Sequence, residues 1–437
     1  MCGIWAFLGQ GAPSYVTRMA PWLMHRGQEG VSYACSVGDA LVKLDNVNDL
    51  ASTLCIGHAR YSTSGPYNVE LQPIVLGDMA LVFNGTIANY RELARVMRGK
   101  GLEVGNEHYD AWVLAMYLRY LLTKHGVEDA IRRLFMTVKG GYAIIAIWKG
   151  QLLLIRDPWG IRPLSVGFNE DGIAAASETS ALEVLGFRWR ELEPGRAVVF
   201  NSRGDVNEYY ADSVGSNRRA YCALEYIYFM RPDSYFNGIS VYSVRQRLGL
   251  SLARKEPIKD IDVVTPIPES ARIAAQSYAK ALGRPMEDLI VKNRFLGRNF
   301  IKPPMERNRE LYGIVREGVR DKSLALIDDS IIRGDTLRSL IPRLRRYGAR
   351  AIHVRVSSPP IRYPCFMGMD FPTRRELIAH GRTIDEVREI LGADSLIYLT
   401  VDELLWSIGV DEVCTACFTG NYPFDVNIDE LERDFAR

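Results

Sequence analysis

A cysteine directly follows the first methionine, and a glycine follows the cysteine. If Met1 is removed, Cys2 carries both a thiol and a free α-amine. An α-amine with a pKa of roughly 7.7–8.0 is partly unprotonated near neutral pH. It can therefore serve as the general base for the thiol of its own residue. Cys2 is a candidate nucleophile, although a small residue here is also favoured simply because it tolerates removal of the methionine.

A second stretch whose residue types could carry chemistry is LALIDDSIIRGDT (324–336). An apolar strand ends in Asp328 and Asp329, and a short loop leads into a helix-length segment. Ligands of open α/β sheets bind beyond the carboxyl ends of strands, and the N–H groups and dipole of a helix start favour a phosphate. Ser330 and Thr336 add hydroxyl groups, and the two acids suit ribose hydroxyls and a divalent cation. Taken alone, the acid pair could equally be a solvated turn before a capped helix.

The cysteines are sparse and odd in number. Cys414-x-x-Cys417 alone fits a redox pair, a zinc half-site or two buried thiols. Few cysteines in a long chain indicate a reducing compartment, where thiols serve as nucleophiles or metal ligands, so we expect a cytoplasmic protein. The seven are Cys2, Cys35, Cys55, Cys222, Cys365, Cys414 and Cys417.

Residues 1–210 alternate short apolar runs with glycine-rich turns. Two β-rich runs flank Lys149-Gly150, which predicts a hairpin. Residues 108–126 have the length and composition of a buried helix, and Gly126 is predicted to end it. Paired strands with helices between them predict a layered α/β sandwich.

The pattern changes after the polar, aperiodic segment 211–221, where we place a domain boundary. Beyond it, short apolar strands alternate with helix-length segments, which favours a parallel sheet covered by helices on both faces. The strand-bearing segments are 260–268, 322–330, 349–358 and 394–400. The predicted domains are 2–210 and 222–410, followed by a tail over 411–437 that has little periodicity.

The composition is that of an ordinary globular protein, with 47% apolar residues, 24% charged residues and a net charge of +2. A nucleic-acid or membrane-surface partner usually needs a concentrated basic face. No apolar run approaches the roughly 20 residues of a membrane span, and the N-terminus lacks the pattern of a signal peptide. We therefore expect neither a nucleic-acid partner nor a membrane partner.

Five motifs in the first 200 residues resemble, in the same order, the glutaminase domain of the glutamine phosphoribosylpyrophosphate amidotransferase family. The resemblance implies an N-terminal αββα sandwich of the Ntn-hydrolase type with Cys2 as its nucleophile. The motifs are CGIWAFLG (2–9), HRGQEG (25–30), GHARYSTSG (57–65), FNGTIANYREL (83–93) and RDPWGIRPL (156–164).

The resemblance also implies which residues bind glutamine. Arg60 would receive the α-carboxylate, because its planar fork matches that group. The Asn84 side chain and the Gly85 backbone N–H would stabilise the oxyanion, and Asp110 would receive the ammonium group. The family's usual Ser-Asp-x-Glu pattern reads Tyr-Asp-Ala-Trp around Asp110. The structural alternatives are a surface strand cation for Arg60, a turn for Asn84-Gly85 and a helix cap for Asp110.

The acid-pair stretch resembles the phosphoribosyltransferase signature, which implies a Rossmann-like type I phosphoribosyltransferase domain. Asp335 stands where this family usually has Thr, so we expect it to contribute its backbone N–H, with its carboxylate turned away or capping the helix. Residues 263–271 resemble the pyrophosphate loop, and 291–301 resemble the lid that carries Lys292, Arg294 and Arg298. The implied ligands of phosphoribosyl pyrophosphate are Asp328, Asp329, Ser330, Arg333, Gly334, Asp335, Thr336, Lys292 and Arg298, with Ser270, Asp328 and Asp329 at one Mg²⁺ per subunit.

Three cysteine-bearing segments, 221–234, 357–368 and 414–423, resemble those of the iron–sulfur branch of the family. The implied ligands of one [4Fe–4S] cluster per subunit are Cys222, Cys365, Cys414 and Cys417. Zinc would also accept four thiolates. Cys35 and Cys55 fall outside these segments, and for them we expect buried packing.

The expected activity is amidophosphoribosyl transfer, the first committed step of purine synthesis, with glutamine and phosphoribosyl pyrophosphate as substrates. We also expect a homo-oligomer, with purine nucleotides as candidate feedback inhibitors. One alternative is a non-catalytic sensor of phosphoribosyl pyrophosphate, against which the full set of glutaminase motifs argues. Another is a cluster-based redox sensor. The glucosamine phosphate and asparagine amidotransferases are disfavoured, because their acceptor domains are absent and residues 324–336 are present.

Overall fold

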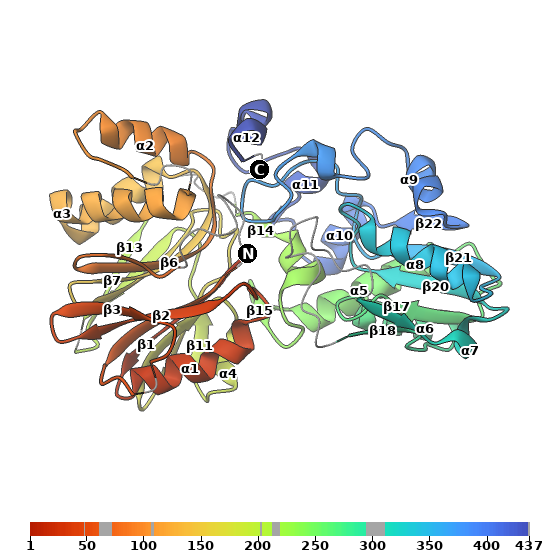
Figure 1. The fold of residues 1–437 in the computed structure, drawn as a ribbon, viewed down its shortest axis with the longest axis horizontal. Coiled ribbons are helices and arrows are strands. Elements are labelled where there is room, and N and C mark those ends of the chain that lie inside the picture. Colours follow the sequence, from red (N-terminus) through yellow and green to blue (C-terminus); the bar gives the residue numbers. More distant parts are fainter. Residues whose placement is uncertain are drawn as a thin grey trace. The chain divides into compact units, whose positions relative to one another are not determined.

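The computed structural model describes residues 1–47, 49–60, 72–105, 109–201, 203–211, 219–293 and 311–435. The chain forms two compact units (Figure 1). The N-terminal unit comprises Met1–Tyr221, Cys365–Pro372 and Pro423–Arg437. The C-terminal unit comprises Cys222–Pro364 and Thr373–Tyr422. The N-terminal unit therefore includes two segments from late in the sequence, and the tail predicted over 411–437 contributes to both units.

Two antiparallel sheets lie face to face in the N-terminal unit. The first has the order β11-β9-β10-β1-β4-β2-β3 and the second the order β13-β12-β8-β7-β6-β5. The strands of the first are β1 Gly3–Gly9, β2 Val31–Val37, β3 Ala40–Leu44, β4 Leu54–Ala59, β9 Ser165–Asn169, β10 Gly172–Ala176 and β11 Arg188–Glu191. Those of the second are β5 Ile74–Leu76, β6 Met79–Ile87, β7 Gly140–Trp148, β8 Gln151–Arg156, β12 Arg196–Phe200 and β13 Val206–Tyr210.

Helices cover the outer face of each sheet. In Figure 1, α1 (Ala12–Leu23) and α4 (Thr179–Glu183) lie below the first sheet, and α2 (Tyr90–Arg98) and α3 (Asp110–Thr137) lie above the second. Alternate side chains of the strands, such as Ile56, Val82 and Ile145, are buried between the two sheets. The opposite face of β1 packs Trp5 and Phe7 against α1. These layers confirm the predicted αββα sandwich.

Two local predictions in this unit are confirmed. The hairpin at Lys149-Gly150 forms, because Trp148 pairs with Gln151 and both turn residues have positive φ, 48° and 73°. Gly126 interrupts the helix as predicted, because its backbone is non-helical, at φ 75° and ψ 177°. A second helical segment, which the sequence analysis did not predict, follows directly and ends at Thr137, so α3 consists of two helical segments joined at a kink.

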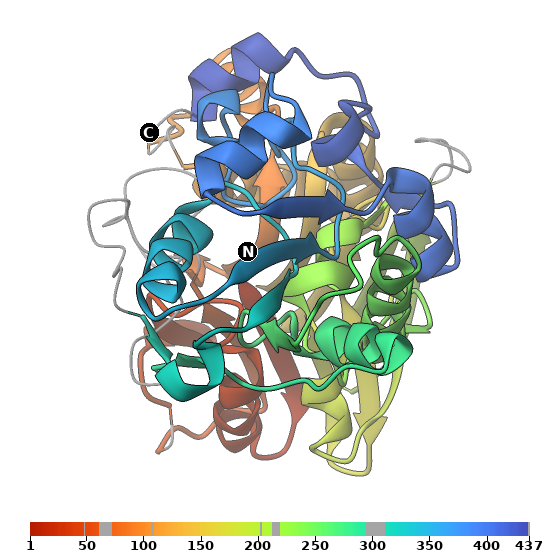
Figure 2. The same ribbon diagram turned by 90° about the vertical axis from the view of Figure 1, so that its right-hand side faces the viewer.

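The C-terminal unit is built on a parallel sheet with the order β17-β20-β21-β22. Its strands fall in the four segments predicted from sequence: β17 Val263–Pro266, β20 Ser323–Asp328, β21 Ala351–Val356 and β22 Ser395–Tyr398. The helix α8 (Asp335–Arg346) packs leucines on one face of the sheet, together with α9 (Ile384–Leu391). The helices α5 (Val241–Arg254) and α6 (Arg272–Leu282) cover the other face (Figure 2). This arrangement confirms the predicted parallel sheet with helices on both faces.

Short elements complete the unit. Its further helices are a π-helix at Glu225–Phe229, α7 Arg316–Val319, a 3₁₀-helix at Arg374–Glu376, α10 Val401–Ile408 and α11 Ala416–Thr419, while α12 Ile428–Phe435 belongs to the N-terminal unit. The two-stranded sheets are β14 Tyr221–Cys222 with β23 Val413–Cys414, β15 Tyr235–Phe236 with β16 Ile239–Ser240, and β18 Ile290–Lys292 with β19 Tyr312–Ile314.

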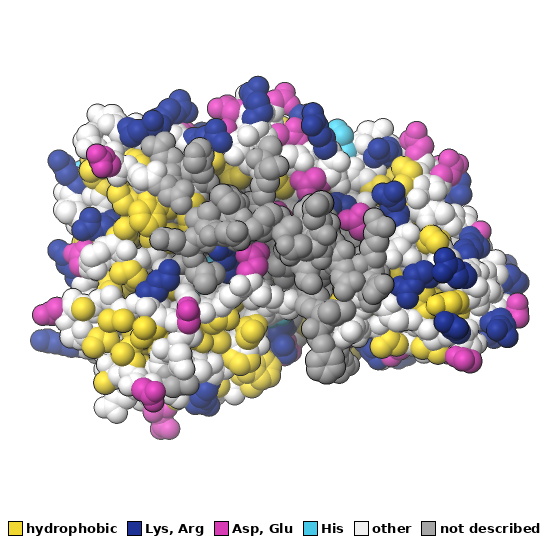
Figure 3. Space-filling view, in the orientation of Figure 1, with side chains coloured by type: hydrophobic (Ala, Val, Ile, Leu, Met, Phe, Trp, Pro, Cys, Tyr) yellow, Lys and Arg dark blue, Asp and Glu magenta, His cyan; other side chains and the backbone are white. Residues whose placement is uncertain are grey.

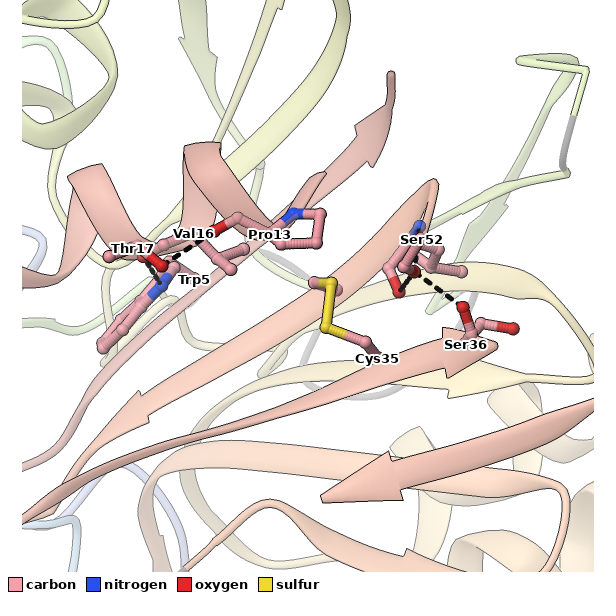
Figure 4. Close-up of a disulfide and its surroundings, with 9 residues drawn as sticks. Trp5, Pro13, Val16, Thr17, Cys35, Ser36 and Ser52 are labelled. Atoms are coloured by element: carbon pink, nitrogen blue, oxygen red, sulfur yellow. Dashed lines mark hydrogen bonds between the residues drawn. A yellow bond between two sulfur atoms is a disulfide. The ribbon is translucent and has the colours of Figure 1, made fainter. Parts of the chain in front are cut away.

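Cys35 and Cys55 are joined by a disulfide between β2 and β4 (Figure 4). Both are fully buried, as expected, but the bond itself is not predicted by the sequence analysis. The two cysteines occupy paired positions of adjacent antiparallel strands, with their Cα atoms 4.1 Å apart. Such proximity depends on strand register, which a separation of 20 residues does not reveal.

Two surface properties bear on candidate partners. None of the described helices is long and apolar enough to cross a membrane. On the face drawn in Figure 3, the basic and acidic side chains of the described residues are interspersed.

Candidate active site

Cys2 lies at the start of β1, where the neighbouring strand β4 ends. Gly3 pairs with Ala59, so Cys2 lies beside the point where the chain continues into Arg60. Arg26, which is fully buried, donates from Nε to the carbonyl oxygen of Cys2 at 3.2 Å. Its guanidinium is held in turn by Glu178 at 2.6 Å. The backbone of the candidate nucleophile is therefore fixed by a buried ion pair.

The α-amine of the first residue is buried at the same place. Burial lowers the pKa of this Met1 amine to about 4; Cys2 and Asp370 act to raise the pKa, whereas Arg26 and Arg162 lower it. An amine with this pKa is neutral at pH 7. Removal of Met1 would place the α-amine on Cys2 itself, directly beside the thiol.

Asn84 and Gly85 lie within strand β6, which excludes the alternative of a turn. Both amide atoms of the Asn84 side chain are buried and lack a hydrogen-bond partner among the described residues. A buried polar group in this state costs about 1–3 kcal/mol, and an oxyanion would relieve that cost for the N–H. Gly85 has a φ of +148°, and a Cβ there would lie 1.9 Å from the carbonyl oxygen of Gly141. Only glycine fits at this position.

Arg60 and Asp110 are both buried, at 6% and 1% exposure, so Arg60 is not a surface cation. Arg60 Nε lies 3.1 Å from Glu29 Oε2. Asp110 is the first residue of α3 and accepts hydrogen bonds from Ile87 N at 3.0 Å and Ala111 N at 2.9 Å. It thereby ties the end of β6 to the start of α3.

A tyrosine shows that these groups lie together. Burial raises the pKa of Tyr109; the charges of Cys2 and Asp110 raise it further, and Arg60 lowers it. Its hydroxyl accepts from Gln72 Nε2 at 3.3 Å. The charges of Cys2, Asp110 and Arg60 all act on this buried phenol, so the candidate nucleophile and two of the proposed glutamine-binding residues share its electrostatic surroundings.

Sequence reasoning did not assign roles to Arg26 or Arg162, although both fall in the quoted motifs. Asp157 shapes the loop that carries Arg162, because its carboxylate accepts from the backbone N–H groups of Trp159 and Ile161, each at 3.0 Å, and from that of Arg162 at 3.2 Å. A buried acid with several backbone donors is a typical loop-fixing device. The motif RDPWGIRPL indicated a loop, but it did not indicate which residues Arg162 would contact.

In the C-terminal unit, the acid pair lies at the carboxyl end of β20, as predicted. Asp329 accepts hydrogen bonds from the hydroxyls of Ser270 and Ser330, the latter at 2.7 Å. Burial, and then the charge of Asp329, raise the pKa of Asp328 well above its usual value. Two buried carboxylates side by side favour a shared cation or hydroxyl donors. Burial, and then the charge of Asp328, raise the pKa of the Tyr398 phenol. The sequence analysis did not identify this residue.

The loop after the acid pair leads into α8 through Gly334, which has a φ of 80° and directly precedes the helix. Asp335 begins the helix, where an acid is favourable to the dipole. The Arg333 side chain is held by Glu376, because its Nε donates a hydrogen bond to Glu376 Oε2 at 2.9 Å. Lys292 ends strand β18. Arg294 and Arg298 lie outside the described residues.

The four cysteines of the expected cluster are free of disulfides. Cys222 and Cys414 lie on the paired strands β14 and β23. The carbonyl oxygen of Cys417 accepts from the N–H groups of residues 362 and 363, at 2.8 and 3.0 Å. Cys365 belongs to the N-terminal unit. Within the described ranges, no group of three or more Cys, His, Asp or Glu residues is arranged to hold a metal ion.

Comparison with known proteins places this geometry in a family. Residues 58–184 match the family model described as a glutamine amidotransferase domain. The chain is 40% identical to the amidophosphoribosyltransferase of Pyrococcus horikoshii, over 97% of this chain and 96% of that protein. It is 36% identical to the Bacillus subtilis enzyme of the same name, with 98% and 95% covered.

Solved structures agree. The glutamine phosphoribosylpyrophosphate amidotransferase of B. subtilis, in complex with ADP and GMP, superimposes with a TM-score of 0.86 at 34% identity and covers 98% of each chain. The two chains therefore share one fold over nearly their whole length. The chain belongs to the amidophosphoribosyltransferase family.

Proposed function

We propose that the N-terminal unit releases ammonia from glutamine at Cys2 and that the C-terminal unit adds this ammonia to phosphoribosyl pyrophosphate. The overall reaction is that of the family: glutamine, phosphoribosyl pyrophosphate and water give 5-phosphoribosylamine, glutamate and pyrophosphate in purine synthesis. The observation that carries the glutaminase half is the buried amide of Asn84, which has no hydrogen-bond partner among the described residues and stands next to Gly85. Gly368 lies against both Gly85 and Arg162, and Arg162 contacts Met1, the residue before Cys2.

The residues divide the first reaction between them. The α-amine of Cys2, freed by removal of Met1, takes the thiol proton as sulfur attacks the carbonyl carbon of the side-chain amide of glutamine. The Asn84 amide and the Gly85 N–H receive the oxyanion. Arg60 holds the α-carboxylate, and Asp110 holds the ammonium group. Ammonia leaves with the proton, and water then hydrolyses the γ-glutamyl thioester to glutamate.

We place the second reaction at the carboxyl end of β20 in the parallel sheet, where the acid pair lies. Asp328 and Asp329 would hold the ribose hydroxyls and, with Ser270, one Mg²⁺. Ser330 to Thr336 would hold the 5′-phosphate through the backbone N–H groups at the start of α8. Lys292 and Arg298 would face the pyrophosphate. Bound Mg²⁺ would neutralise charge on the leaving pyrophosphate, while the acid pair fixes the ribose for attack of ammonia at C1.

The purified protein is expected to release pyrophosphate from phosphoribosyl pyrophosphate only when glutamine or ammonia is also supplied. A coupled pyrophosphate assay with each substrate omitted in turn measures this. Binding of phosphoribosyl pyrophosphate without turnover would instead favour the sensor. The buried arrangement around Cys2 argues against that alternative, because a sensor has no use for an oxyanion site.

We further propose one [4Fe–4S] cluster on Cys222, Cys365, Cys414 and Cys417. Four cysteines that form no disulfide suit such a cluster, and the pairing of β14 with β23 brings the chain at Cys222 and Cys414 together. The side chains are not arranged as a metal group in the described structure, so the support comes from the chemistry of the donors and their backbone placement. The reaction needs no redox step, and the cluster would be structural.

Anaerobically purified protein is expected to contain about four irons and four sulfides per chain. Cys414→Ser should lower iron content and the temperature of unfolding, because metal binding is coupled to folding. The substitution Ser407→Ala in the same unit is the matched control for expression and metal analysis. Zinc without sulfide in the wild-type protein would contradict the cluster and leave the transferase proposal standing.

The remaining proposals concern partners and location. Because the B. subtilis relative was solved in complex with ADP and GMP, we propose that purine nucleotides bind this chain as feedback inhibitors. We also propose a cytoplasmic homo-oligomer, because five of the seven cysteines form no disulfide; the buried Cys35–Cys55 disulfide is the exception to this pattern.

A further inference from the structure

A short segment from the second half of the sequence is buried in the N-terminal unit. The segment Phe366–Asp370 follows Cys365, and none of its described side chains is more than 6% exposed. Phe366 packs against Phe435 of α12, with ring centroids 6.2 Å apart. The segment is therefore part of the packed glutaminase unit, although the sequence places it more than 150 residues beyond the last motif of that domain.

Gly368 brings the backbone of this segment against the candidate oxyanion site. Its φ is +115°, and a Cβ at this position would lie 3.1 Å from Gly85 Cα and 3.2 Å from Arg162 Nε. The adjacent Met367 approaches Gly141 of strand β7, which pairs with the strand that carries Gly85. A Cβ on Gly141 would be 3.1 Å from Met367 Cβ. Gly85 is thus enclosed by Gly141 on one side and by Gly368 on another.

The same segment reaches the α-amine. Asp370 is 6% exposed, and its charge acts on the amine of the first residue. The charged groups that face this amine are Cys2, Arg26, Arg162 and Asp370, with the neutral ring of His58 also within range of it. Asp370 opposes the effect of the two arginines on the pKa of the Met1 amine, so this segment lies within electrostatic range of the residue next to Cys2.

We infer that Phe366–Asp370 forms a wall of the glutaminase site and that Gly368 is a positioning residue that holds the Gly85 N–H toward the oxyanion. The inference rests on the proposed role of Gly85. Its physical basis is the close backbone approach: a methyl group at Gly368 must push Gly85 or Arg162 by a few tenths of an ångström. Oxyanion donors lose their effect when they are displaced from the developing charge.

The test compares Gly368→Ala with Gly381→Ala, a matched control. Gly381 also has positive φ, +66°, but a Cβ there meets nothing within 4 Å. For Gly368→Ala, we expect kcat of the glutaminase reaction to fall about tenfold while KM for glutamine changes less than twofold, because only transition-state stabilisation is lost. The ratio of glutamine-dependent to ammonia-dependent synthesis should fall by the same factor. Gly381→Ala should match the wild type.

A second measurement separates positioning from loss of fold. Alkylation of Cys2 by iodoacetamide needs the thiol pocket but no oxyanion donor, so Gly368→Ala should be alkylated at the wild-type rate. Equal glutaminase kcat in the two alanine variants would overturn the inference. So would a rise in KM together with slowed alkylation, which indicates general loosening. Glutamine-dependent turnover by a Cys2→Ala protein would instead overturn the proposed function itself.

Discussion

Replacing Cys2 by alanine is expected to lower glutamine-dependent synthesis by about 10⁴-fold or more, because loss of an attacking nucleophile removes the covalent route altogether. Ammonia-dependent synthesis should remain measurable, since the acid pair and the loop before α8 lie in the other compact unit. Both rates can be measured by pyrophosphate release, with glutamine or with ammonium chloride at high pH as the nitrogen source.

Cys35→Ala is not a suitable control, because it breaks a disulfide. Cys2→Ser is better, since it keeps a small N-terminal residue with a weaker nucleophile. Intact-mass analysis of the wild type should show that Met1 is gone, and a fully active protein that retains Met1 would refute the α-amine as base. Equal loss of both activities in Cys2→Ala would refute the division of labour between the units.

The double substitution Asp328→Asn with Asp329→Asn is expected to lower kcat/KM for phosphoribosyl pyrophosphate by about 100-fold or more, because two charged contacts are lost. Hydrolysis of glutamine at Cys2 should persist. Burial and the charge of Asp329 raise the pKa of Asp328, so the ionised form of Asp328 is unfavourable in the folded protein. Because the double variant removes these charges, it should unfold at the same or a higher temperature than the wild type.

Asp385→Asn serves as the matched control in the same unit, because its side chain is 89% exposed and far from the sheet edge in sequence. Steady-state kinetics in phosphoribosyl pyrophosphate, together with thermal unfolding, compare the three proteins. Kinetics of the double variant that match those of Asp385→Asn would exclude the acid pair from the substrate site.

The sequence predicts those parts of the fold that local patterns determine. Each of the four apolar segments of the second half becomes a strand of the parallel sheet, and the Lys149-Gly150 turn closes its hairpin. Gly126 breaks the helix as its residue type predicts, with a non-helical φ of 75° and ψ of 177°. The second helical segment that follows it, as far as Thr137, was not predicted from the sequence.

The site could be predicted only in its nearby pieces. Cys2, Arg60, Asn84 and Asp110 stand out by type and motif. In the structure, Cys2 and Arg60 lie next to the paired residues Gly3 and Ala59, and the charges of Cys2, Arg60 and Asp110 act on Tyr109. The presence of Gly368 and Asp370 in the N-terminal unit could not be predicted, because no local pattern marks a segment that packs against residues far away in the sequence. The Cys35–Cys55 bond depends on strand register in the same way.

The central claim is that nitrogen released at Cys2 is the nitrogen that appears on C1 of the sugar. The direct measurement supplies glutamine labelled with ¹⁵N in the amide, phosphoribosyl pyrophosphate and Mg²⁺ to the wild-type protein. The product phosphoribosylamine is trapped and its label measured, together with glutamate and pyrophosphate. We expect labelled product, with one glutamate formed for each pyrophosphate. Glutamate formed without labelled product, or pyrophosphate released without glutamate, would contradict the account.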